Sequence, residues 1–294
     1  MSRLYLRPSR GGFIFALKKL YICKNAIRIT FKFMNMKKFT LISVSLILAA
    51  ASAFAWTKKS ENTGNLGRMY VSFGGGVNMA KVKADGNKLD PTGGYGEAVI
   101  NAPVFKPGVN AFRDIKWAGV DANAFFNYDY SGKFKVNDDL SGVASNTYSV
   151  GVGLTPYLNI ETKLPALKAI KPFGIAYAGY AWNDVSSDQS TGTDGSSNYF
   201  IYGVGGGVEF VILDQLSFTP TWQWRGNAES GKACYQVVTA ELAYWFTEQF
   251  CFSAFWTHNF GYTDTYIDGN GDPVNVNYRH GDIIGLKFKI GFNR

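Results

Sequence analysis

Two histidines are the first candidates for chemistry, because imidazole is the only side chain whose ordinary pKa lies near neutral pH. A catalytic histidine is commonly oriented by a carboxylate, as in an Asp-x-His couple. The residues two positions before His258 and His280 are Trp256 and Tyr278, so neither histidine follows that pattern. Asp282 follows His280 by two positions, in the reverse order. We therefore expect a hydrogen-bonding role for the histidines and no enzymatic activity.

A second candidate is the run Asp268-Gly269-Asn270-Gly271-Asp272, which offers oxygen ligands at alternate positions as a calcium loop does. The twelfth position of such a loop should be a bidentate Glu, and here it is Arg279. The same residue types also make consecutive turns. We favour the turns and predict no metal, other cofactor or catalytic residue.

The segments that must position the remaining polar residues alternate between apolar and polar residues, with a period of two. Apolar residues alternate with polar ones along 216–225, and the apolar set is Leu216, Phe218, Pro220, Trp222 and Trp224. This alternation is the pattern of β-strands. The alternating segments last about 10–15 residues, whereas strands of soluble sheets average 5–6 and tilted transmembrane strands need about 9–11. The pattern predicts an all-β fold, an antiparallel up-and-down transmembrane β-barrel.

Nine segments alternate clearly, and a tenth, 96–105, is weaker because Pro103 lacks a ladder donor. Single-chain bacterial barrels have an even number of strands, so we predict ten, with eight as the alternative. The expected strands are 68–80, 96–105, 115–129, 147–159, 172–183, 200–210, 216–225, 233–246, 250–263 and 284–292. The expected outer loops are 81–95, 130–146, 184–197, 226–232 and 264–281. The expected periplasmic connections are 106–114, 160–171, 212–215 and 247–249.

The start of the chain has the order of a secretory signal peptide. The basic Met36-Lys37-Lys38 precedes an uncharged stretch, 39–55, which is short for a membrane-spanning helix. Ala53 and Ala55 occupy the −3 and −1 positions of a signal-peptidase site. We therefore divide the chain into an upstream extension from an early start codon (1–33), a signal peptide (34–55), a short periplasmic segment (56–66) and the barrel (67–294).

The net charge of +8 belongs to the leader. Residues 1–55 contain ten Lys and Arg and no Asp or Glu, whereas 56–294 contain the other 20 bases and all 22 acids. The exported part is therefore slightly acidic. Binding to nucleic acid needs a basic surface, so we do not expect a nucleic-acid partner.

The exported part resembles the small outer-membrane β-barrels of the outer-membrane-protein-A and opacity type. The resemblance rests on Tyr70-Val71-Ser72-Phe73-Gly74-Gly75-Gly76, on Gly203-Val204-Gly205-Gly206-Gly207-Val208-Glu209 and on the closing Phe288-Lys289-Ile290-Gly291-Phe292. It covers 67–294 and lies in the general residue pattern, without a diagnostic motif. It implies a protein of the cell outer membrane that contacts outer-membrane lipid and the barrel assembly machinery, and we expect a monomer.

If the apolar faces point to lipid, acids and bases meet in the lumen. The inward set includes Asp121, Glu209, Arg225, Glu241, Lys287 and Lys289, together with Asn123, Asn127, Thr219 and Gln223. A selective pore tends to show rings of one sign, whereas this set is mixed. Unpaired charges in a narrow lumen are costly, so we predict a polar network with at least one acid–base contact, in which Arg225 pairs with Glu241 or Glu209.

Two functions remain open from the sequence. The first is a structural or surface-interaction protein that presents outer loops, such as 184–198, to a surface ligand that the sequence does not identify. The second is a minor, narrow channel for small solutes.

Overall fold

The computed structural model describes residues 64–84, 87–89, 92–105, 117–132, 144–186, 195–213, 215–228, 234–267 and 273–292. The predicted cleavage-site residues Ala53 and Ala55, the predicted upstream extension 1–33 and the candidate calcium loop 268–272 lie outside these residues. So does most of the expected outer loops 130–146, 184–197 and 226–232, whereas most of 81–95 and 264–281 is described and is strand. The described residues form strands and turns only. No helix long and apolar enough to cross a membrane occurs among them.

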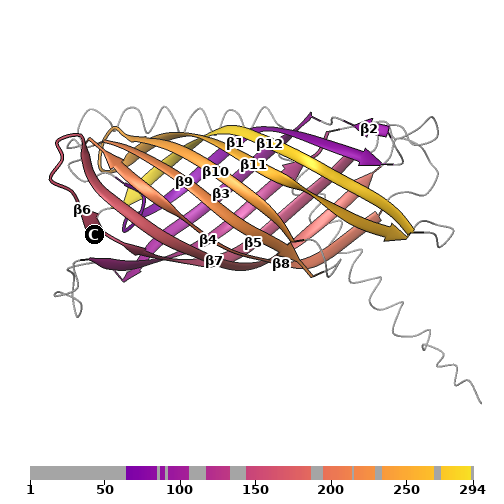
Figure 1. The fold of residues 1–294 in the computed structure, drawn as a ribbon, viewed down its shortest axis with the longest axis horizontal. Coiled ribbons are helices and arrows are strands. Elements are labelled where there is room, and N and C mark those ends of the chain that lie inside the picture. Colours follow the sequence, from indigo (N-terminus) through magenta and orange to yellow (C-terminus); the bar gives the residue numbers. More distant parts are fainter. Residues whose placement is uncertain are drawn as a thin grey trace, which may run out of the picture. The chain divides into compact units, whose positions relative to one another are not determined.

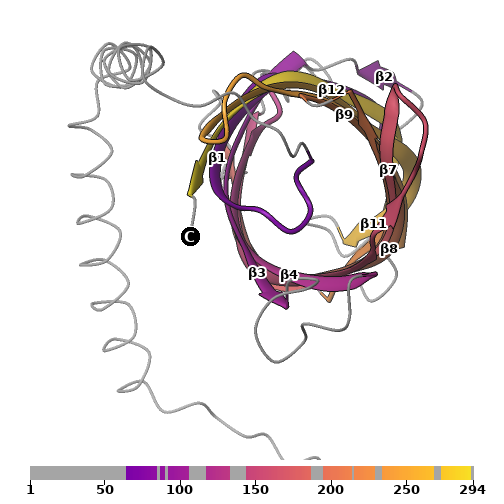
Figure 2. The same cartoon turned by 90° about the vertical axis from the view of Figure 1, so that its left-hand side faces the viewer.

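Ten long strands form one antiparallel sheet that closes on itself (Figures 1 and 2). They are β1 (Met69–Ala84), β3 (Thr92–Phe105), β4 (Ala118–Tyr130), β5 (Ala144–Leu158), β7 (Leu167–Ser186), β8 (Gly195–Ile212), β9 (Leu216–Asn227), β10 (Cys234–Trp245), β11 (Phe250–Ile267) and β12 (Pro273–Phe292). Two short strands, β2 (Asn87–Leu89) and β6 (Ile160–Glu161), pair with β1 and β7. Each long strand pairs with the next, and β12 pairs with β1 to close the barrel.

The predicted up-and-down barrel of ten strands is therefore confirmed. The weak segment 96–105 is indeed a strand, β3, and the register of its pairing with β4 shifts between Pro103 and Phe105. An irregularity of this kind tolerates the missing proline donor. The structure differs from the prediction at β7, which begins at Leu167 inside the expected connection 160–171.

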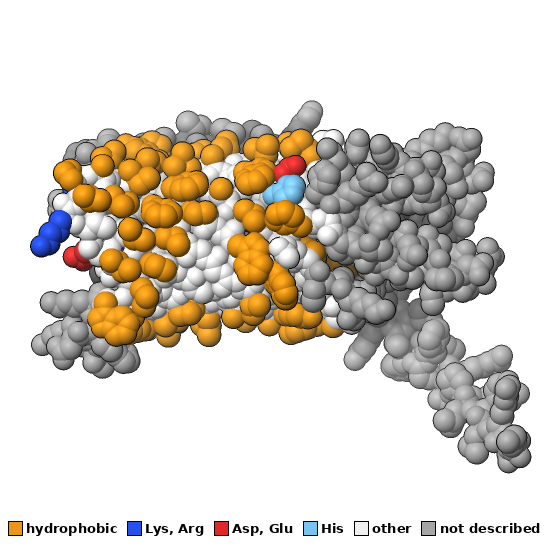
Figure 3. All heavy atoms as spheres, viewed as in Figure 1, with side chains coloured by type: hydrophobic (Ala, Val, Ile, Leu, Met, Phe, Trp, Pro, Cys, Tyr) orange, Lys and Arg blue, Asp and Glu red, His pale blue; other side chains and the backbone are white. Residues whose placement is uncertain are grey.

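The outer wall of the barrel is apolar and the opposite face of each strand is buried. Exposed apolar side chains come from all ten long strands, and hydrophobic side chains are spread over the coloured part of the face in Figure 3. Val152 is 65% exposed and Leu286 is 56% exposed. Their neighbours face the lumen: Gly153 is buried, and the Lys287 side chain contacts Glu97. An apolar wall is stable in contact with lipid. The alternation in the sequence therefore reflects strands with one face toward lipid and the other toward a polar lumen.

Glycines on the inward face leave room for large lumenal side chains. A Cβ atom at Gly74 would lie 2.8 Å from Cγ of Glu97, and one at Gly207 would lie 2.7 Å from the Phe173 ring. Gly74 on β1 and Gly207 on β8 therefore leave space that these lumenal side chains occupy.

Leu286→Arg should lower the free energy of unfolding in lipid bilayers by about 2–4 kcal/mol, because the charge would enter the hydrocarbon. Denaturant titration in lipid vesicles measures this change, with Leu286→Met as the control that keeps an apolar side chain. Equal stability of the two variants would contradict the register, since a slip of one residue exchanges the two faces.

Candidate functional site in the barrel lumen

The segment that precedes β1 lies inside one mouth of the barrel. We call this segment, Gly64–Arg68, the strap. Figure 2 shows it curving from β1 across the opening. Gly64 and Gly67 have φ angles of +118° and +82°, which glycine adopts readily, and they allow the chain to turn back on itself. The sequence assigned 56–66 to the periplasm, and the structure places Gly64–Leu66 in the lumen instead.

The Glu209 carboxylate of β8 holds the strap by its main chain. The amide of Asn65 donates to Glu209 Oε1 at 2.5 Å, and the amide of Leu66 donates to Oε2 at 3.2 Å. Lys171 of β7 lies 3.7 Å from the same carboxylate and donates to the carbonyl of Leu66 at 3.1 Å. Glu209 is fully buried, so these donors replace the water that the carboxylate has lost.

A second carboxylate, Asp121 of β4, holds the other end of the strap. Its Oδ2 accepts the amide of Gly67 at 2.9 Å and the side-chain amide of Asn101 at 3.1 Å. Arg68 donates to the carbonyl of Glu248 at 2.7 Å, and its guanidinium lies 4.1 Å from the centre of the Trp245 ring. The strap is therefore bound at both ends.

The contacts of the strap come from opposite walls of the barrel. Around the ring the long strands follow the order β1, β3, β4, β5, β7, β8, β9, β10, β11 and β12, so β8 lies five places from β1. The strap leaves β1, reaches Glu209 on β8 and Asp121 on β4, and Asn65 accepts a hydrogen bond at 2.9 Å from Lys289 on β12. It therefore spans the lumen at this mouth.

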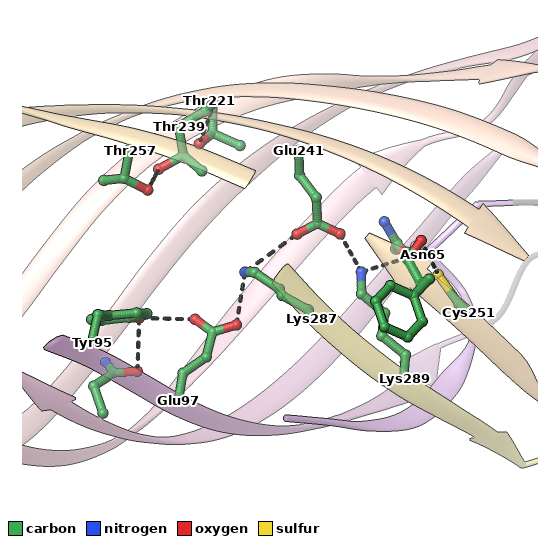
Figure 4. Close-up of polar contacts among 12 residues, drawn as sticks. Asn65, Tyr95, Glu97, Thr221, Thr239, Glu241, Cys251, Thr257, Lys287 and Lys289 are labelled. Carbon is green, nitrogen blue, oxygen red and sulfur yellow. Dashed lines mark hydrogen bonds and ion pairs between the residues drawn. The ribbon is translucent and has the colours of Figure 1, made fainter. Parts of the chain in front are cut away.

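A second group of charges is centred on Glu241 of β10 (Figure 4). Its Oε1 contacts Lys289, and its Oε2 lies 3.3 Å from Lys287. Lys287 also lies 2.8 Å from Oε1 of Glu97 on β3, and the hydroxyl of Tyr95 donates to Glu97 Oε2 at 2.8 Å. Each ammonium thus faces at least one carboxylate, which offsets the cost of burying both charges.

Arg225 does not pair with the predicted acids. Its Nε donates to Gln223 at 3.1 Å, and its electrostatic neighbours are the hydroxyls of Tyr177, Tyr235 and Tyr95. Both expected partners, Glu241 and Glu209, contact lysines instead. The prediction of an Arg225 ion pair was wrong because Lys171 was assigned to a turn and the inward partner Glu97 was not considered.

The structure thus brings together three predicted lumenal residues, Glu241, Lys287 and Lys289, and it places Glu209 and Asp121 against the strap. Sequence reasoning missed Glu97 and Lys171, although each occupies an inward position in its strand. It also missed the strap, which precedes the alternating pattern. Extending the period of two through β3 and the start of β7 would have found both side chains.

The only described histidine side chain lies on the outer wall. His258 Nδ1 is 2.9 Å from Asp282 Oδ1 on the neighbouring strand, and Trp256 Nε1 donates to the same oxygen at 2.9 Å. The rings of Trp256 and Phe260 contact the His258 ring, and Ile284 lies opposite Trp256 on the outer wall. The couple has the hydrogen-bonding role that the sequence predicts.

A closed antiparallel barrel with an apolar wall and a charged lumen is the architecture of outer-membrane proteins. The protein is an outer-membrane β-barrel. Exposed aromatic pairs on the outer wall, such as Trp222 with Trp224 and Tyr180 with Trp182, agree with the aromatic girdles of such barrels.

Neither a protein-family model nor a curated protein sequence matches the chain. Among solved structures, the attachment invasion locus protein Ail of Yersinia pestis is 14% identical, with 76% of this chain and 99% of that chain covered and a TM-score of 0.31. The transport unit of the autotransporter AIDA-I from Escherichia coli is 11% identical, with 83% and 97% covered and a TM-score of 0.49. The outer membrane protease OmpT from Escherichia coli is 10% identical, with 76% and 97% covered and a TM-score of 0.37.

Glu209→Gln should lower the free energy of unfolding by about 3 kcal/mol, because it leaves the buried Lys171 ammonium without its counter-charge and weakens the hold on two amides. Denaturant titration in detergent micelles measures this loss. Glu161→Gln, at an exposed position in β6, makes the same chemical change and should stay within about 0.5 kcal/mol of wild type. Equal effects of the two substitutions would show that Glu209 does not hold the strap.

Proposed function

We propose that the protein is a non-conducting scaffold of the outer membrane that presents its outer loops at the cell surface. The barrel supplies a rigid frame, and loops on rigid frames commonly carry binding functions. We further propose that it acts as a monomer without catalytic activity, in contact with outer-membrane lipid and, during assembly, with the insertion machinery.

The observation that supports this proposal most strongly is the strap. It spans the periplasmic mouth between β8, β4 and β12, and its main chain is bound by two buried carboxylates. We assign this mouth to the periplasm because β1 begins there and β12 ends there, and the termini of such barrels are periplasmic.

A second layer of side chains supports the same proposal. Tyr95 of β3 and Arg225 of β9 lie on strands five places apart in the ring and are electrostatic neighbours. The Glu241 group lines the wall between β10 and β3. A ten-stranded barrel is only slightly wider than one that side chains fill completely, so two such layers leave little space for an ion path.

Single-channel recording in planar lipid bilayers tests the proposal, and the wild-type protein should show no stable conductance. The control is a known porin reconstituted in the same bilayer. Stable, ion-selective wild-type currents would contradict the scaffold function and favour the narrow channel.

A further inference from the structure

Arg225 lies near the outer end of the lumen. It is the tenth of the twelve residues of β9, a strand that begins at the periplasmic side. Its cross-strand neighbours are Tyr235, the second residue of β10, and Gly203 on β8. Tyr95 is the fourth residue of β3, which begins at the outer side. These positions place the guanidinium on the side of the lumen that faces the cell exterior.

Neutral hydrogen-bonding groups converge on this guanidinium. Gln223 accepts a hydrogen bond from Nε, and the hydroxyls of Tyr177 and Tyr235 are electrostatic neighbours of Arg225. The Tyr177 hydroxyl lies against Gly203, where an added Cβ atom would come within 2.6 Å of it. Only glycine at 203 therefore lets this hydroxyl reach the neighbourhood of Arg225.

The neighbours of the Arg225 charge differ from those of the other lumenal bases in the described strands. Lys171, Lys287 and Lys289 each contact at least one carboxylate. Within the described part of the chain, Arg225 donates to the amide oxygen of Gln223, and its electrostatic neighbours are phenols. A cation in a confined lumen is costly without a counter-charge.

We propose that Arg225 and Tyr177 form a binding site for a small oxyanion, a phosphate or a carboxylate, that enters from the cell exterior. A guanidinium presents five N–H donors in a planar fork that matches such oxyanions. The Tyr177 phenol beside Arg225 can donate its O–H to the same anion. The inference rests on the proposed function in one respect: entry from the cell exterior alone requires that the strap close the periplasmic route.

Isothermal titration calorimetry with inorganic phosphate, and separately with sodium acetate, tests the site on the full mature protein refolded in detergent. Both titrations use a buffer of constant ionic strength. Saturable binding of one anion per barrel is expected. Arg225→Gln should weaken it by tenfold or more, because it removes a charged hydrogen-bond donor worth roughly that factor.

Tyr177→Phe should weaken binding by about fivefold, in line with the loss of one neutral hydrogen bond, and it keeps the ring that packs at 5.5 Å on Phe125. This variant keeps the test decisive if Arg225→Gln fails to refold. The matched control is Lys163→Gln, which removes one positive charge from an exposed periplasmic turn and should leave binding unchanged.

Absence of saturable binding of both anions by the wild type would overturn the site. Binding that Arg225→Gln and Tyr177→Phe leave unchanged would overturn it as well. Because calorimetry does not depend on conduction, a conducting barrel that still binds phosphate through Arg225 would refute the scaffold function and keep the site.

Discussion

The interaction that holds the strap across the lumen is the binding of main-chain amides by the buried carboxylate of Glu209. A carboxylate at that depth must be satisfied by donors, and among the described residues of the wall Lys171 alone contacts it. The amides of Asn65 and Leu66 provide the others. Because the strap runs from β1 to the opposite wall to reach this carboxylate, the satisfaction of one buried charge also carries the chain across one mouth of the barrel.

The same requirement organises the rest of the lumen. An apolar outer wall forces the polar residues inward, and the narrow barrel then forces acids and bases to meet. Glu241 between Lys287 and Lys289 and Asp121 between Gly67 and Asn101 are two solutions to that problem. Among the described residues Arg225 is the exception, since its hydrogen-bond partner Gln223 and its tyrosine neighbours are neutral, and this exception is what points to a ligand.

Much of the fold could be predicted from sequence, because a strand that faces lipid on one side carries an apolar residue at about every second position. The ten strands follow from this pattern, including β3 with its unfavourable Pro103. The partners inside the lumen could not be predicted in the same way, because the pairing of Lys287 with Glu97 depends on which strands close the ring and on side-chain reach. The strap has no periodicity, and its contacts with Glu209 use main-chain atoms that every residue possesses.

Amide hydrogen exchange of the strap, measured by nuclear magnetic resonance on the refolded protein, tests the central claim most directly. If the carboxylates of Glu209 and Asp121 hold the strap, the amides of Asn65, Leu66 and Gly67 should exchange at least a hundredfold more slowly than in a free peptide, as expected for hydrogen-bonded amides with an opening free energy of about 3 kcal/mol. Exchange at the rate of a free peptide, beside protected amides in β1, would contradict the account, because the strap would then not be bound in the lumen.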